Sequence, residues 1–172
     1  RGIAMDLLLD TADLAEVEHA LQCYPIKGVT TNPTMLSRLA QTHVMSHLKA
    51  LRTLIGEERD LHVQLMAADH QTMIREAHHL VSELGERTFI AVPVTEVGLS
   101  VIKQLAQEGL NITASTVFST MQGILAMLSG ARYVAVFYDR MLNLDIEAAR
   151  VIKELAGLLW TNTSSTQVLA AS

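Results

Sequence analysis

The feature that most constrains the fold is a repeated unit, in which an apolar strand-like run is followed by an amphipathic helix-like segment. The pattern predicts six such units and a seventh run with no helix after it. The predicted strands cover residues 6–10, 26–31, 61–66, 88–94, 110–118, 133–138 and 166–172. Strands that alternate with helices of this length pair in parallel through right-handed crossovers, so the predicted class is α/β.

The expected helices begin and end at residues suited to those positions. Asp13 with Glu16 three residues later has the spacing of a capping box before an apolar helical face. Asn32 and Pro33 suit a helix cap and a first helical residue, and apolar spacing then predicts helix over 35–55. Glycines are expected to stop four of the helices, at Gly56, Gly85, Gly109 and Gly130.

Two architectures fit such a rhythm, an open doubly wound sheet and a (β/α)8 TIM barrel. The open sheet usually carries a glycine-rich phosphate loop after an early strand, and neither G-x-G-x-x-G nor G-x-x-x-x-G-K-[ST] occurs. A barrel instead assembles its site from single polar residues at the carboxyl ends of different strands. The residues Asp10, Asn32, Gln64 and Arg140 are placed in this way. The barrel is therefore favoured.

Length and composition bound the rest of the organisation. With 172 residues, 49% of them hydrophobic, the chain is expected to form one domain over 5–172. Barrels of this kind usually need about 250 residues, so we expect about seven strands, without the eighth strand and the terminal helices. Residues 1–4 precede Met5 and are expected to be a vector-derived leader.

Charge and cysteine usage point away from several classes of protein. The formal net charge is −5 and the 13 basic residues are scattered, which argues against a nucleic-acid partner. No apolar run is long enough to cross a membrane, and Cys23 has no second cysteine to pair with. We expect a cytoplasmic protein.

Several stretches together resemble one family. "LLLDTADLAEVE…YPIKGVTTNPTML", "LHVQLM", "VPVTEVGLSVIKQLAQEG", "ITASTVFSTMQGILAMLSGARYVAVFYDR" and "QVLAAS" are similar, in the same order and with similar spacing, to the fructose-6-phosphate aldolase and small transaldolase family. The combination of T-T-N-P, V-P-V-T and A-x-Y-V-A is far more specific than any single motif. The resemblance covers 5–172.

The resemblance implies a barrel enzyme that handles sugar phosphates through a Schiff base on a lysine, with no metal, no organic cofactor and a homo-oligomeric assembly. The family's lysine lies two residues before the proline of V-P-V-T, and this chain has Ala91 at that position. Imine formation needs an amine, so lysine-dependent activity is predicted to be lost. The chain's four lysines, Lys27, Lys49, Lys103 and Lys153, are expected on the outer surface or at the wrong end of the barrel. Whether Ala91 is engineered or natural stays open.

The resemblance also assigns roles at the ends of the first five strands. Asp10 matches the acid that positions the lysine and the substrate hydroxyls. Thr31 and Asn32 belong to the substrate-binding set, although Asn32 before proline is also a good helix cap. Gln64 matches the residue that orders a proton-relaying water, and Ser115 the threonine near that water.

The sixth and seventh strands carry the remaining expected residues. Phe137 matches a position that is tyrosine in the aldolase branch and phenylalanine in the transaldolase branch, whereas Gln64 is typical of aldolases, so the branch stays open. Strand alternation should point Tyr138 away from the site. Arg140 and Ser172 match the pair that holds the sugar phosphate, a task suited to a guanidinium and a hydroxyl.

Two further interpretations remain. The spacing of His43 and His47 on a presumed helix could supply two metal ligands, but without a third ligand solvated histidines are favoured. The protein could also be a non-catalytic sugar-phosphate-binding or interaction protein on the same scaffold. The joint departure of Ala91, Phe137 and Asp139 from the aldolase pattern favours that second function.

Overall fold

A computed structural model describes residues 5–39, 43–143, 147–161 and 164–171. The strands are β1 (Leu7–Asp10), β2 (Ile26–Thr30), β3 (Asp60–Gln64), β4 (Thr88–Pro93), β5 (Asn111–Val117), β6 (Tyr133–Phe137) and β7 (Gln167–Ala171). The helices are α1 (Leu14–Cys23), α2 (Pro33–Leu39), α3 (Val44–Ile55), α4 (His70–Leu84), α5 (Glu96–Gln107), α6 (Thr120–Leu128), α7 (Tyr138–Leu142) and α8 (Ala148–Thr161). Strand and helix thus alternate as the sequence pattern predicts.

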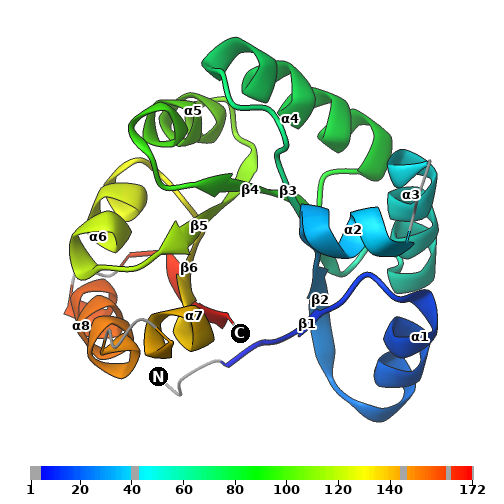
Figure 1. The fold of residues 1–172 in the computed structure, drawn as a ribbon, viewed down its shortest axis with the longest axis horizontal. Coiled ribbons are helices and arrows are strands. Elements are labelled where there is room, and N and C mark those ends of the chain that lie inside the picture. The colour runs from blue at the N-terminus through cyan, green and yellow to red at the C-terminus, as the bar shows by residue number, and fades with distance from the viewer. Residues whose placement is uncertain (1–4, 40–42, 144–146, 162–163, 172) are drawn as a thin grey trace.

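The strands form one seven-stranded sheet in the order of the chain, from β1 to β7, and every neighbouring pair is parallel. Figure 1 shows the strands curling about a common centre with the helices on the outer side. This is the architecture of a (β/α)8 TIM-barrel-type fold with seven strands present. In the part of the chain that the structure describes, β1 and β7 are the two edges of the sheet.

Local sequence signals set most helix ends. The side chain of Asp13 accepts hydrogen bonds from the backbone amides of Ala15 and Glu16, which caps α1. All four predicted stop glycines have positive φ angles, between 74° at Gly56 and 98° at Gly130. This conformation costs a glycine little because it has no Cβ atom.

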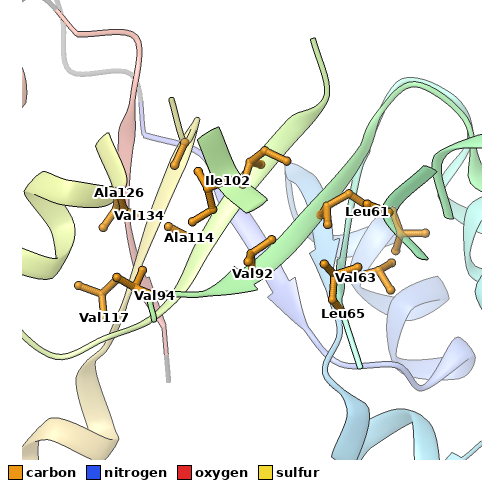
Figure 2. Close-up of a cluster of buried hydrophobic side chains, with 14 of the residues drawn as sticks. Leu61, Val63, Leu65, Val92, Val94, Ile102, Ala114, Val117, Ala126 and Val134 are labelled. Carbon is orange, nitrogen blue, oxygen red and sulfur yellow. The ribbon is translucent and has the colours of Figure 1, made fainter. Parts of the chain in front are cut away.

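The main core lies between the sheet and its helices. Alternation along β4 points Ile90 and Val92 outward into this core, where they are fully buried. Figure 2 shows Val92 and Val94 in the same cluster as Leu61 and Val63 of β3. Ala91, which lies between Ile90 and Val92 along β4, therefore faces the inside of the curled sheet.

Two local predictions are wrong. The expected continuous helix over 35–55 is two helices, α2 and α3, and α3 packs between α1 and α4. No glycine or proline marks this break, so tertiary packing decides it. Lys27 lies at the amino end of β2, inside the predicted strand and at the end of the barrel expected for it. Tyr138 begins α7 and packs on the core rather than extending β6.

Candidate active site

A cavity of about 320 Å³ opens at the carboxyl ends of the strands. Its wall is formed by Asp10, Thr30, Thr31, Asn32, His62, Gln64, Ala91, Thr113, Ser115, Ala135, Phe137, Asp139, Arg140, Asn143, Leu169 and Ala171. Eight of the nine site residues expected from the sequence are among them. The ninth, Ser172, lies outside the described residues.

Ala91 lies in the wall of this cavity at the centre of the sheet. Its neighbours in register are Gln64 on β3 and Thr113 on β5, and its methyl group is 7% exposed. A side chain longer than alanine would enter the cavity from this position. None of the chain's four lysines lines the cavity. Among the residues that the structure describes, the wall therefore has no amine that could form an imine with a ligand.

Asp10 is an exposed carboxylate at the rim. The Thr30 hydroxyl donates to Asp10 Oδ1 over 2.6 Å, which ties the ends of β1 and β2 together and orients the carboxylate. Its second oxygen can accept a hydrogen bond from a ligand hydroxyl.

The two residues after β2 also have structural roles. The hydroxyl and the backbone amide of Thr31 both donate to the carbonyl oxygen of His62 over 3.0 Å. Asn32 Oδ1 accepts from the backbone amide of Met35 over 2.9 Å and so caps α2. The cap that the Asn-Pro pair predicts is present, and it directs the oxygen of Asn32 to the helix. A ligand would therefore meet the amide nitrogen of Asn32.

Ser115 follows Thr113 on the face of β5 that lines the cavity, as regular strand alternation requires. The register with β6 shifts between Ala114 and Val117, as in a β-bulge. Thr116 in the bulge has φ 61°, a left-handed conformation that is strained for a β-branched residue. The bulge interrupts the alternation after Ser115, so Val117 is buried in the outer core and does not face the cavity.

Phe137 and Arg140 form the wall at the end of β6. The guanidinium carbon of Arg140 lies 5.7 Å from the centre of the Phe137 ring, within the range of a cation–π interaction. Phe137 also meets the Phe118 ring edge to face at 5.9 Å. The aromatic ring thus supports the exposed guanidinium of Arg140, the one cationic group in the cavity wall among the described residues.

His62 also lines the cavity and is not among the residues expected from the sequence. Its Nδ1 atom is 2.8 Å from the hydroxyl oxygen of Thr113, and its ring stacks on Phe89 at 4.6 Å. Burial lowers the pKa of His62 to about 3, so the ring is neutral. The available signal was the period of two along "LHVQ", which places His62 on the same face of β3 as Gln64.

Within the described ranges, no cluster of three histidine, cysteine or acidic side chains could hold a metal ion. Of the two histidines considered as metal ligands, His43 is the N-cap residue of α3 and is exposed. His47 Nε2 is 2.6 Å from the carbonyl oxygen of Ala12. No helix among the described residues is both long enough and apolar enough to span a membrane.

Single polar side chains from successive strand ends converge on one cavity, the arrangement by which (β/α)-barrel proteins bind and transform small molecules. The sequence profile of the transaldolase/fructose-6-phosphate aldolase family matches residues 7–172. The chain belongs to this family.

A related sequence is the probable fructose-6-phosphate aldolase of Streptococcus pneumoniae (strain ATCC 700669 / Spain 23F-1). It is 39% identical over 168 residues, which are 98% of this chain and 76% of the relative.

Solved structures support the architecture independently. Muconate cycloisomerase from Pseudomonas fluorescens matches 95% of the chain with a TM-score of 0.64 and 14% identity. A mandelate racemase/muconate lactonizing protein from Paracoccus denitrificans PD1222, complexed with magnesium, matches 96% with a TM-score of 0.62 and 13% identity. The chain spans 45% and 46% of their lengths. At this identity the likeness shows the fold alone.

Proposed function

We propose that this chain is a fructose-6-phosphate aldolase/transaldolase-like protein that handles sugar phosphates of the fructose 6-phosphate type, and that it has lost their Schiff-base cleavage because Ala91 replaces the lysine. The observation that carries the proposal is the methyl group of Ala91 in the cavity wall, where no lysine takes part. Family membership supports the ligand class, and the rim guanidinium of Arg140 supports recognition of a phosphate.

The chemistry defines what is missing. A lysine amine would add to the ketose carbonyl and lose water to give an imine, which accepts electrons from the neighbouring carbon–carbon bond as that bond breaks. Glyceraldehyde 3-phosphate would leave, and the dihydroxyacetone unit would remain as an enamine to be protonated and hydrolysed, or transferred to another aldose phosphate. A methyl group offers no lone pair for the first step.

The decisive experiment restores the amine. Ala91→Lys is expected to form an imine with dihydroxyacetone that borohydride reduces to a stable adduct, visible in the intact mass. The matched control is Ala135→Lys, which places a lysine in the same cavity from β6, where Ala135 is 4% exposed. An adduct that forms on Ala91→Lys and not on Ala135→Lys supports the proposal. Adduct on the unmodified chain would refute it, since another amine would then serve.

The second candidate is a non-catalytic binding protein on this scaffold. It is favoured by Asp139, an acidic residue beside Arg140 in the cavity wall, where the resemblance leads us to expect asparagine. The same variant separates the two functions. Cleavage of fructose 6-phosphate by Ala91→Lys supports an aldolase that lacks only its lysine, and binding without turnover supports the binding protein.

A further inference from the structure

Two residues of the cavity wall each carry a buried polar atom that has no hydrogen-bond partner. Among the described residues, four buried side-chain polar atoms have no hydrogen-bond partner, namely His62 Nε2, Arg87 Nε, Thr88 Oγ1 and Ser115 Oγ. Two of the four belong to residues that line the cavity, His62 and Ser115. Buried polar atoms are nearly always paired in native proteins, because an unpaired one has given up its hydrogen bonds to water. A group that enters the cavity could supply a partner for these two atoms.

The ring of His62 is held in one orientation. It is 2% exposed and stacks on Phe89 with 12° between the ring planes, while Tyr133 meets it edge to face at 5.3 Å. Its Nδ1 atom is engaged with Thr113. Nε2 is consequently the one ring nitrogen left for a ligand, and the packing fixes its direction before any ligand binds.

The strand register places this ring close to position 91. In the strand register, His62 on β3 lies opposite Phe89 on β4, and Thr113 on β5 lies opposite Ala91 on β4. The hydrogen bond from His62 to Thr113 therefore crosses β4 between Phe89 and Ala91. His62 thus lies two residues deeper in the sheet than Gln64, which is level with Ala91, and both His62 and Ala91 line the cavity.

The wall near His62 is neutral, unlike the rim. Burial lowers the pKa of His62 to about 3, so the ring is neutral at ordinary pH. Its hydrogen-bond partner, Thr113, is also uncharged. A phosphate brings negative charge into the cavity, and this wall has no charge that compensates it. A hydroxyl both donates and accepts, so it can pair with Nε2 in either tautomer of the ring.

We propose that His62 is a further ligand-binding residue, whose Nε2 atom pairs with an uncharged hydroxyl group at the inner end of the ligand. This inference rests on the proposed function. The cavity then orients a phosphorylated sugar, with its phosphate at Arg140 on the rim and its hydroxyl end at His62 inside.

The first test observes the ring directly. In ¹⁵N-histidine NMR spectra of the whole chain, the His62 signals are those lost in His62→Phe. Fructose 6-phosphate and dihydroxyacetone are expected to shift the Nε2 resonance, and inorganic phosphate is expected to leave it unchanged. A resonance that moves with phosphate alone, or with none of the three compounds, overturns the inference.

The second test measures affinity. His62→Phe retains an aromatic ring for stacking and removes the nitrogen, so binding of fructose 6-phosphate should weaken about 5- to 20-fold, with affinity for inorganic phosphate unchanged. The control is His19→Phe on the exposed face of α1. His62→Gln, which restores a polar atom, should recover part of the lost affinity and replaces the first variant if His62→Phe does not fold.

The outcomes separate the two proposals. If fructose 6-phosphate binds and Arg140→Ala weakens it while His62→Phe does not, the role of His62 is wrong and the proposed function stands. If neither fructose 6-phosphate nor dihydroxyacetone binds the unmodified chain, and Ala91→Lys forms no adduct, both are wrong.

Discussion

At the scale of single residues, the cavity separates charged from neutral groups. Asp10 and Arg140 are exposed at the rim, whereas Ala91, Ser115 and His62 are buried in the wall. Charged side chains are costly to bury without partners, and neutral hydrogen-bonding groups are much less so. The separation suits a ligand with an ionised group at one end.

The rim guanidinium should decide affinity for the phosphate. Arg140→Ala is expected to weaken binding of fructose 6-phosphate about 10- to 100-fold, as loss of a charge-assisted hydrogen bond does, and to leave any binding of unphosphorylated fructose unchanged. Titration calorimetry of both sugars measures this. The control is Arg150→Ala, an exposed arginine of α8 that pairs with Glu147 and Glu154. Equal losses of fructose 6-phosphate affinity in Arg140→Ala and Arg150→Ala would contradict the assignment of phosphate binding to Arg140.

His62 should also make stability depend on pH. Its pKa is about 3 in the native state and near 6.5 unfolded, so between these values the unfolded chain binds a proton that the native chain does not. The stability linked to neutral His62 is therefore fully present above pH 6.5 and is lost as the pH falls toward 3.

Urea unfolding at pH 6.5 and 4.5 tests this sign. The unmodified chain should lose roughly 2 kcal/mol more over this interval than His62→Phe. The comparison cancels the carboxylates common to both. An identical pH dependence in the two proteins would show that His62 is protonated in the native state as easily as in the unfolded chain.

At the scale of elements, each functional residue depends on how a strand is joined to its helix. β4 ends at Pro93, Thr95 caps α5 through the backbone amide of Gly98, and the chain turns back over the sheet. A Cβ atom at Gly98 would overlap the carbonyl oxygen of Pro93. The close approach of α5 to the end of β4 therefore requires glycine.

Two alanine substitutions test this packing as a pair. Gly98→Ala should lower the free energy of unfolding by about 2 kcal/mol or more, because backbone must move. Gly157→Ala in α8, where nothing lies within 4 Å of an added Cβ, should raise it by about 0.5–1 kcal/mol through helix propensity. Chemical denaturation measures both. Similar effects at the two sites would refute the steric argument.

At the scale of the whole molecule, the two ends of the barrel have different tasks. The carboxyl end carries the cavity, and the amino end carries Arg52, which is 5% exposed. Its guanidinium donates to four backbone carbonyls, those of Gly56, Leu84, Arg59 and Arg87. It thereby joins the ends of α3 and α4 to the segments that lead into β3 and β4.

Arg52→Met should destabilise the protein by about 3 kcal/mol or more, since it leaves buried carbonyls without donors. Affinity of the folded fraction for fructose 6-phosphate should not change, because Arg52 lies at the opposite end from the cavity. The control Arg75→Met alters an exposed arginine of α4 that donates to Thr72. Weaker ligand binding with unchanged stability would contradict the division of tasks.

Much of this architecture could be predicted from local pattern. The alternation of strands and helices, the cap at Asp13 and the stop glycines follow from periodicity and backbone conformation, which act over a few residues. The convergence of residues such as Asp10 and Gln64 on one cavity follows from parallel pairing, since the carboxyl ends of parallel strands meet at one edge.

The sequence by itself determined the fold class, the family and the absence of a lysine at position 91. Only the tertiary structure decided that α2 and α3 are separate helices, that β5 bulges at Thr116 and that the ring of His62 is held between Phe89 and Thr113. These features depend on contacts between residues far apart in the chain. A bulge, a buried ring and a helix break of this kind are set by packing, which periodicity does not encode.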